Sequence, residues 1–577
     1  MSLINCYLAI AIITLTITKK TDSADTKVLI LGAGASGLNA AQTLHYKGEN
    51  DFIILEAEDY YGGRVHNERI LDEVVEMGAN WIHPVGSKLE ELAKAIDMNT
   101  RRSDFEDLIA LTDKGADVTD DYKLALERFD DKLNDVITLG EKYIKDDEAD
   151  ISLSLGLRNI GWKAKTPEEI LAEWFRVDFD LADGPERASL LAYAADKLYV
   201  EEKEDPVVED NFNSNSLYEE YRERTDLVLV KENDPYNYRN RDDDWENNNW
   251  SNWYDDYRRR RRRRRQTVGK NQQEQFVIDR QGYKSIFNRT MSFLLKTDQR
   301  DNIRFNKVVE RIDYSDSNEV TVYCTDGTRY TAEYVLVTFS LGVLQSDLIQ
   351  FDPPLPAWKT DYWNRFEMAA YSKIFMNFQD DKFWGNTEWI ANVDNNRKQG
   401  QWPLFLNFAH EDLYLQDTHL LMAIITGDEA RRVESLTVDE IKKEAEENLD
   451  EMYNRYTVPR PRAIMVSNWT QNPYTLGSFA FWSYGTDRGC FGKMESRVDK
   501  VFFAGEATSL NNTGNLQGAL ESGKREGLKI YDCLQGGSCG KWNTKTKCGC
   551  GSTASGISFV SIHIVVLFSV LFNKIMS

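Results

Sequence analysis

The sequence predicts an α/β protein that contains a doubly wound, Rossmann-like dinucleotide-binding domain. Three observations near the start of the chain predict it. The apolar run Val28–Leu31 is typical of a buried parallel strand, a glycine-rich turn follows, and the next apolar run, "DFIILEA", ends on the acidic Glu56. The turn has the GxGxxG spacing, with Gly32, Gly34 and Gly37. Strand, turn, alanine-rich helix, strand and acid follow in order within about thirty residues, which favours dinucleotide binding over an ordinary glycine-containing turn.

Length and composition indicate a globular chain. The 577 residues are enough for two or more domains, and 41% hydrophobic and 12% aromatic residues exclude a mainly disordered protein. A net charge of -24 argues against a dedicated nucleic-acid binder. It is compatible with a cationic substrate, because a cleft lined with carboxylates concentrates cations, although a solvated acidic surface would give the same total.

Both ends of the chain are apolar and predict passage through the secretory pathway. Residues 1–24 resemble a signal peptide, with a buried N-terminal strand as the alternative. Residues 557–577 predict a GPI-attachment signal or a short membrane anchor, with a docked strand as the alternative. We therefore expect an extracellular or cell-surface protein attached to the membrane through its C-terminus.

The residues before that end form a cysteine-containing tail, 535–556. Four cysteines crowd this tail and the residues just before it and predict two small-loop disulfides whose pairing stays open: Cys533, Cys539, Cys548 and Cys550. No histidine is interleaved with them, and we expect no metal site. The chain also has four N-x-S/T sequons, at Asn249, Asn288, Asn468 and Asn511. We expect Asn468 and Asn511 to be buried.

A charged, low-complexity segment, 201–265, interrupts the middle of the chain and ends in eight consecutive arginines. Such a composition cannot bury enough apolar area to offset the entropy of ordering, so we expect a disordered surface insertion. The arginines offset the acidic residues before them. This favours an intramolecular role over a nucleic-acid site, with an anionic surface as a remaining alternative.

Several motifs together resemble the FAD-dependent amine oxidase family, and within it the polyamine oxidases. They are "DYYGGRVHNERI", "EMGANWIHPVG", the long segment Tyr334–Phe378, and "VFFAGEATSLNNTGNLQGALESGKREG". The resemblance extends from Lys27 to about Leu534, apart from the charged insertion. It implies a doubly wound FAD-binding domain and a second, α+β substrate domain with a mixed sheet and helices. FAD-binding segments are expected at 25–105, 280–345 and 465–534, and substrate-domain segments at 106–279 and 346–464.

The same resemblance implies the residues that bind FAD. The first turn cradles the pyrophosphate, Glu56 binds the adenosine ribose and Arg64 lies near the phosphates. Val309 contacts the adenine through its backbone, Glu506 faces the ribityl–pyrophosphate region, and Leu516 lies near the flavin ring. The full expected set is Gly32, Ala33, Gly34, Gly37, Glu56, Gly63, Arg64, Asn80, Trp81, Val309, Gly505, Glu506 and Leu516.

For the reaction itself, the resemblance implies a catalytic Lys373 close to flavin N5 through a water. Apolar residues flank it on both sides, which favours an inward-facing lysine over a surface one. At the position of His83 the secreted plant enzymes carry an acid, whereas animal spermine and acetylpolyamine oxidases carry a histidine, as this chain does. His83 is the second catalytic candidate. Asn515 stands where plant enzymes carry an aromatic residue. The expected substrate-binding residues are Trp81, Asp180, Asp183, Tyr371, Trp469, Tyr474 and Asn515.

These expectations combine into an oxidase that acts on a small cationic amine. A hydride passes from an amine-adjacent carbon to flavin N5, the imine is hydrolysed to an aldehyde and a shorter amine, and dioxygen yields hydrogen peroxide. An L-amino-acid or monoamine oxidase on the same fold is the alternative enzyme. A surface or matrix protein that keeps the flavin scaffold without catalysis is the alternative from another class. The oligomeric state is open.

Overall fold

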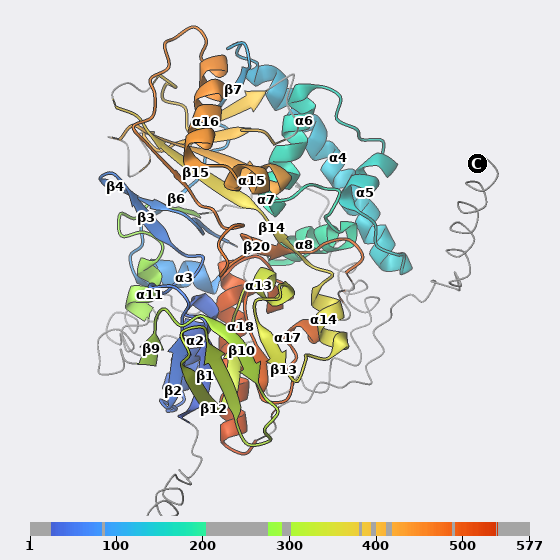
Figure 1. Ribbon diagram of the computed structural model, residues 1–577. Coiled ribbons are helices and arrows are strands. Elements are labelled where there is room, and N and C mark those ends of the chain that lie inside the picture. Colours follow the sequence, from blue (N-terminus) through green and yellow to red (C-terminus); the bar gives the residue numbers. More distant parts are fainter. Residues whose placement is uncertain are drawn as a thin grey trace, which may run out of the picture.

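A computed structural model shows how these segments fold (Figure 1). The structure describes residues 25–83, 87–203, 275–290, 302–379, 383–393, 400–410, 413, 418–486, 488, 491–537 and 539. The signal segment 1–24, most of the insertion 201–265, and the hydrophobic end 557–577 lie outside the described residues. The expectations for them therefore stay predictions.

An eight-stranded sheet forms the lower half of the molecule in Figure 1 and confirms the dinucleotide-binding fold. Its parallel strands lie in the spatial order β9 (Ile303–Arg304), β2 (Phe52–Leu55), β1 (Thr26–Leu31), β12 (Arg329–Val337) and β21 (Val501–Phe503). Strands β1, β2 and β21 and the end of β12 are apolar and mostly buried, as expected for a parallel sheet with both faces covered.

Strand β12 connects two parts of this sheet. Its first half pairs antiparallel with β11 (Val320–Cys324), and its second half pairs parallel with β21. Beyond β11 lie β10 (Val309–Asp313) and β13 (Gln350–Asp352). We expected the substrate domain to resume at residue 346. Strand β13 lies after that point but still belongs to this sheet, because it pairs parallel with β10.

Two helices beside the sheet are packed unusually closely. They are α2 (Ala35–Tyr46), which follows β1, and α18 (Leu516–Leu534), which follows β21. A Cβ on Gly523 would lie 2.1 Å from the Ser36 carbonyl oxygen, so only glycine allows this approach. The close contact brings the N-termini of both helices to the same edge of the sheet, where β1 and β21 end.

The second domain contains a six-stranded mixed sheet, as predicted. Its order is β19 (Ala463–Val466), β15 (Tyr371–Asn377), β18 (Leu420–Thr426), β17 (Leu404–Asn407), β16 (Trp389–Val393) and β7 (Leu108–Thr112). Only the pair formed by β16 and β7 is parallel. Helix α16 (Val438–Met452) packs on one face and the long helix α4 (Thr119–Asp146) on the other, so residues of β18 are buried on both sides.

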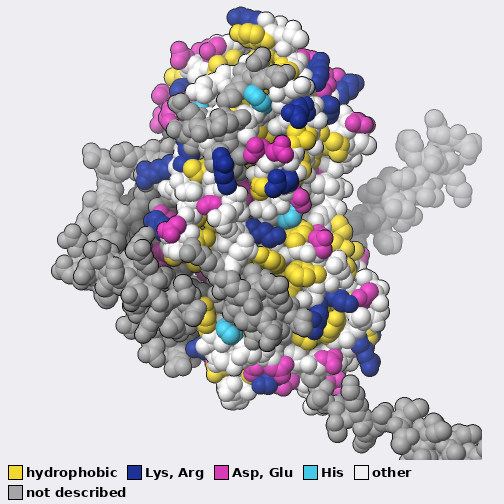
Figure 2. Space-filling model, turned by 90° about the vertical axis from the view of Figure 1, so that its left-hand side faces the viewer, with side chains coloured by type: hydrophobic (Ala, Val, Ile, Leu, Met, Phe, Trp, Pro, Cys, Tyr) yellow, Lys and Arg dark blue, Asp and Glu magenta, His cyan; other side chains and the backbone are white. Residues whose placement is uncertain are grey.

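The described surface is mixed in character. Figure 2 shows basic and acidic side chains interspersed over one face of the molecule. In the part of the chain that the structure describes, no helix combines the length and apolar character needed to span a membrane. Asn468 and Asn511 are exposed, contrary to our expectation, because their neighbours Trp469 and Asn512 face inward instead.

One of the predicted disulfides lies within the described residues. Cys533, near the end of α18, is bonded to Cys539, with 4.8 Å between their Cα atoms. Cys324 is a buried free thiol. Cys548 and Cys550 lie outside the described residues, so the second predicted disulfide stays a prediction.

Candidate active site

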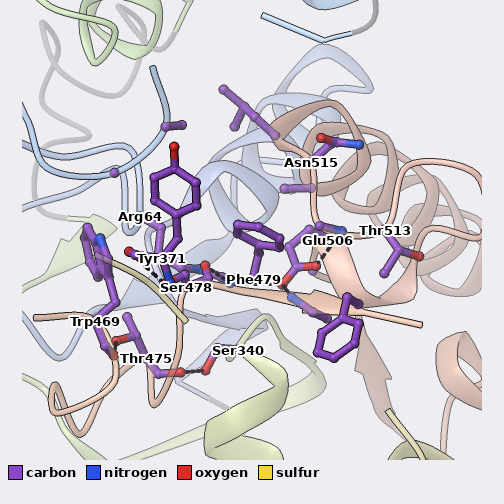
Figure 3. Close-up of a pocket in the computed structure, with 18 of the residues that line it drawn as sticks. Arg64, Ser340, Tyr371, Trp469, Thr475, Ser478, Phe479, Glu506, Thr513 and Asn515 are labelled. Carbon is purple, nitrogen blue, oxygen red and sulfur yellow. Dashed lines mark hydrogen bonds and ion pairs between the residues drawn. The ribbon is translucent and has the colours of Figure 1, made fainter. Parts of the chain in front are cut away.

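A cavity of about 1860 Å³ extends from the dinucleotide-binding sheet into the substrate domain. It begins at the turn between β1 and α2 and ends among helices of the substrate domain. Figure 3 shows Trp469 and Tyr371 on one side of this pocket and Glu506, Thr513 and Asn515 on the other. The cavity therefore joins the two domains in one continuous site.

The glycines at the sheet end form an open cradle. Gly32 has φ +110°, which other residues rarely adopt. Gly34 and Gly63 meet face to face: a Cβ on Gly63 would lie 3.2 Å from the Gly34 Cα. Gly32, Gly34, Gly63 and Gly505 all line the cavity. The backbone can therefore approach a bound pyrophosphate without side chains intervening.

Glu56 lines this end and also holds the turn together. One carboxylate oxygen accepts a hydrogen bond from the Ala33 N–H at 2.7 Å, and the other accepts one from the Glu58 N–H at 2.9 Å. Burial raises the pKa of Glu56, and these backbone N–H groups act in the opposite direction. Glu56 is thus placed for a ribose, but much of its hydrogen-bonding capacity already stabilises the turn.

Ala33 and Gly37 are absent from the described cavity wall. Ala33 contributes its N–H to Glu56, as above. A Cβ on Gly37 would lie 2.0 Å from the Gly32 carbonyl oxygen, so Gly37 allows α2 to start directly against the turn. Both residues shape the cradle from behind.

Arg64 is paired with Glu506 instead of extending alone toward a phosphate. Its Nη1 lies 2.9 Å from a Glu506 carboxylate oxygen and donates to the Ser478 carbonyl at 3.0 Å. Glu506 also accepts from the Ala480 N–H at 3.2 Å and the Gly514 N–H at 2.9 Å. This ion pair fixes three chain segments around the middle of the cavity, which sequence reasoning did not predict.

Lys373 projects from β15 into the cavity and is almost fully buried, with 2% of its surface exposed. Its Nζ lies within hydrogen-bonding distance of the carbonyl oxygens of Glu76 at 3.0 Å and Gly78 at 2.6 Å, and of Oδ1 of Asn80 at 3.2 Å. The ring of Trp81 lies 5.6 Å away. Three oxygens and one indole thus hold a single amino group in a fixed place.

The surroundings of Lys373 favour its neutral form. Burial lowers the pKa of Lys373 well below its ordinary value, although the charge of Glu76 acts in the opposite direction. Burial also raises the pKa of Glu76, whose carboxylate accepts a hydrogen bond from the Tyr283 N–H at 2.7 Å. Burial therefore favours a neutral Lys373 amine beside a neutral Glu76 carboxylic acid over an ammonium beside a carboxylate.

Aromatic side chains form the cavity walls on either side of Lys373. Trp469 is fixed by a hydrogen bond from Nε1 to the Met77 carbonyl at 3.0 Å, and Trp81 donates from Nε1 to Ser103 at 3.2 Å. The other predicted residues that line the cavity are Asn80, His83, Val309, Tyr371, Tyr474, Asn515 and Leu516.

Asp180 and Asp183 have different surroundings, although they are three residues apart. Asp180 lines the cavity. Asp183 is buried and bound to two arginines, Arg187 at 2.9 Å and Arg431 at 2.7 Å, and is absent from the described cavity wall. Ala182, between them, has φ +56°, which turns the chain. This geometry favours Asp180 as the residue that faces a substrate.

Sequence reasoning missed several aromatic residues of the wall, among them Phe175 and Phe179. The rings of these two residues are stacked with centroids 5.5 Å apart. The centroid of the Phe179 ring also lies 6.3 Å from that of Trp81 and 6.0 Å from that of Tyr371. Phe175 and Phe179 are brought together by a π-helical turn, Trp174–Asp178. Their i, i+4 spacing was visible in the sequence, but it is typical of any buried helix face.

We expected no metal site, but among the residues that the structure describes one group of possible ligands lies close together: Asp107, Glu388 and His410. Nε2 of His410 lies 3.1 Å from Oδ2 of Asp107, and Nη2 of Arg101 lies 2.8 Å from Oε2 of Glu388. These ion pairs already give each member of the group a charged or polar partner.

The fold and site geometry agree with comparisons to known proteins. Residues 35–527 match the flavin containing amine oxidoreductase family. Polyamine oxidase 1 of Zea mays is 28% identical over 89% of this chain and 92% of its own length. Human lysine-specific histone demethylase 2 is 26% identical over 87% of this chain and 53% of its own. The solved structure of a putrescine oxidase double mutant matches with a TM-score of 0.60 at 17% identity, over 88% of this chain and 99% of that one.

The chain belongs to the flavin containing amine oxidoreductases. It is an FAD-dependent amine oxidase, as the motifs predicted. The site fits that cofactor: the glycine cradle leaves room for a pyrophosphate, Glu56 lines the cavity beside the cradle, and the cavity continues to Lys373 and the aromatic walls.

Proposed function

We propose that this amine oxidase acts on polyamines or their acylated forms, with dioxygen as the electron acceptor. A secondary amine R–CH2–NH–R′ loses two electrons and two protons to dioxygen, which gives an imine and hydrogen peroxide. Water then cleaves the imine into an aldehyde and the shorter amine R′–NH2. When bound, FAD supplies the two-electron acceptor that connects the amine to dioxygen.

The observation that carries this proposal is the buried Lys373 among aromatic residues inside a long cavity. A long cavity suits a flexible chain with nitrogen atoms at intervals. The similarity to polyamine oxidases over about nine-tenths of the chain supports the same substrate class.

The residues of this chain have separable roles. Trp81, Tyr371 and Trp469 orient the carbon chain and exclude bulk water. In its neutral form Lys373 has a lone pair that can accept a hydrogen bond from water, while the Glu76 and Gly78 carbonyls hold its N–H groups. Lys373 can thus orient the water that attacks the imine and take up its proton.

A substrate panel tests the proposal. The purified protein should show flavin absorbance and release peroxide with spermine, spermidine or their acetylated forms, with the aldehyde and amine products identified by mass spectrometry. Leucine, phenylalanine and benzylamine serve as comparison substrates. Peroxide from these and none from any polyamine would move the protein to the amino-acid or monoamine oxidases, and a colourless protein would contradict cofactor binding.

We also propose that the chain enters the secretory pathway and is attached to the cell surface through its C-terminus. The apolar segments 1–24 and 557–577 support this, together with the cysteine-rich tail. The experiment belongs to the whole molecule and is described below.

A further inference from the structure

Where helices of the substrate domain line the cavity, charged side chains form part of its wall. We call this part the distal end and define it by six residues of the cavity wall: Asp130, Arg176, Asp180, Asp196, Lys197 and Arg488. Asp180 follows Phe179, whose ring contacts Trp81 and Tyr371. The distal end therefore begins one residue beyond the aromatic walls, where the remote part of an extended amine would lie.

Each carboxylate of the distal end is matched by a basic side chain. Asp130 forms two parallel hydrogen bonds with Arg176, at 2.7 and 2.8 Å. Asp180 accepts a hydrogen bond from the Lys197 ammonium at 2.8 Å. Burial raises the pKa of Asp196, while the charges of Lys197 and Arg488 act in the opposite direction. The distal end thus contains three acids and three bases.

Acidic and basic side chains are equally numerous over the whole described cavity wall, in which Lys373 favours its neutral form. The wall has seven carboxylates, Glu56, Glu58, Asp130, Asp180, Asp196, Glu310 and Glu506, and seven Lys or Arg side chains, Arg64, Arg102, Arg176, Lys197, Lys307, Lys373 and Arg488. The described wall is therefore not dominated by carboxylates, the arrangement with which the net charge was compatible. The net charge of -24 belongs to the chain as a whole and not to this site.

Lys197 is held at the distal end as a charged group. Its ammonium lies over the Tyr193 ring at 5.3 Å and is bonded to Asp180. Burial by itself would lower the pKa of Lys197, but Asp180, Tyr193 and Asp196 raise it above its ordinary value. Lys197 therefore remains protonated at neutral pH, in the position that a substrate ammonium would need beside Asp180.

A second ammonium at this place is unfavourable. It would have to displace Lys197 from Asp180 or lie within a few ångströms of it, and like charges repel at that distance. A neutral amide avoids both costs. Its carbonyl oxygen can accept a hydrogen bond from the Lys197 ammonium, which has three N–H donors, and its N–H can donate to a carboxylate.

We propose that Lys197 determines substrate specificity: it makes the distal end accept the neutral amide of an N-acylated polyamine and disfavours a free ammonium there. This inference depends on the proposed polyamine oxidation, since it names which member of that class the site takes. It assigns Lys197 a role as a built-in cation that occupies the place of a substrate charge.

The test compares kcat/KM for monoacetylated spermine and free spermine in the wild type and in Lys197→Met. We expect the wild type to prefer the acetylated substrate at least tenfold. Lys197→Met should reduce that preference at least tenfold, through a gain on spermine, because Asp180 becomes available to the substrate ammonium. Lys197→Arg keeps the charge and should keep the preference. Lys132→Met removes an exposed lysine paired with Asp135 and is the matched control.

Asp180→Asn provides a second variant with the opposite expectation. It leaves Lys197 charged and removes its partner, so spermine should be used even less well than by the wild type. Flavin absorbance and thermal unfolding identify any variant that fails to fold. A wild type that uses spermine as well as its acetylated form, or a ratio that neither Lys197→Met nor Asp180→Asn changes, would overturn the inference. No peroxide from either substrate in the yellow wild-type protein would instead contradict the proposed function.

Discussion

Lys373 and Lys359 show how the same residue type is used for two purposes in one chain. Both are almost fully buried, and each has three oxygen acceptors. The acceptors of Lys359 are the carbonyls of Lys493 at 3.1 Å, Met494 at 3.0 Å and Ser496 at 2.7 Å, at the end of helix α17 (Gly492–Glu495). Lys373 lines the cavity, whereas Lys359 is absent from its described wall.

The two lysines therefore predict opposite results on substitution. Lys373→Met should lower turnover by at least tenfold while the flavin remains bound. Lys359→Met should leave turnover per bound flavin unchanged and cost about 3 kcal/mol of stability, because three buried carbonyls lose their donor. Stopped-flow kinetics and denaturant unfolding of both variants check this. Equal turnover of Lys373→Met and wild type would remove the catalytic role of Lys373.

The stability difference between wild type and Lys359→Met should depend on pH. Burial lowers the pKa of Lys359 to about 7, although Glu526 and Glu495 act in the opposite direction. Between pH 7 and about 10.5 the unfolded chain binds the proton more readily than the folded one, so folding becomes more favourable as pH rises. The cost of the substitution should thus be smallest near pH 7 and grow toward pH 10.

At the scale of secondary-structure elements, a buried carboxylate connects the two walls of the active site. Glu434 ends helix α15 (Gly427–Glu434) and is 5% exposed. It accepts a hydrogen bond from the Ser372 hydroxyl. It also accepts two from Thr470, one from the N–H at 2.7 Å and one from the hydroxyl. Ser372 precedes Lys373 and Thr470 follows Trp469. Because side chains alternate along a strand, Ser372 points away from the cavity while Lys373 points into it.

Glu434→Ala should therefore reduce both stability and turnover, by roughly 2 to 3 kcal/mol and at least fivefold, because Ser372 and Thr470 lose their common acceptor. Glu429 lies on the same helix and pairs with Arg432 at 2.6 Å, so Glu429→Gln is the matched control. We expect it to cost less stability than Glu434→Ala, because the amide oxygen can still accept a hydrogen bond from Arg432, and to leave turnover unchanged. Turnover measurements and urea unfolding of both variants distinguish the effect on catalysis from the effect on stability. A Glu434→Ala protein with wild-type turnover would show that the Glu434 carboxylate contributes to stability alone.

Two other elements show the limits of sequence reasoning at this scale. The strands that carry the nucleotide motif were predictable, since apolar runs and glycine spacing are local features. The π-helical turn Trp174–Asp178 was not, because one extra residue per turn leaves no clear pattern in the sequence. That turn places Phe175 and Phe179 together in the cavity wall.

At the scale of the whole molecule, the ends of the chain give the last prediction. The full-length chain expressed in a eukaryotic host with a secretory pathway should lose residues 1–24 and appear at the cell surface. Surface labelling and N-terminal sequencing check both. Release by phosphatidylinositol-specific phospholipase C would indicate a GPI anchor, and retention after that treatment a membrane-spanning one. A chain that stays in the cytosol with its first residues intact would contradict the proposal.

The sequence by itself determined the family, the FAD-binding motif and the inward-facing Lys373. These depend on spacing and periodicity within short segments, and local chemistry leaves little choice there. Only the tertiary structure decided which charges face the cavity. Asp180 and Asp183 look alike in sequence, yet one lies beside Lys197 and the other between Arg187 and Arg431. Partner choice depends on how distant helices pack, which is why the charge-balanced distal end could not be predicted from a chain of net charge -24.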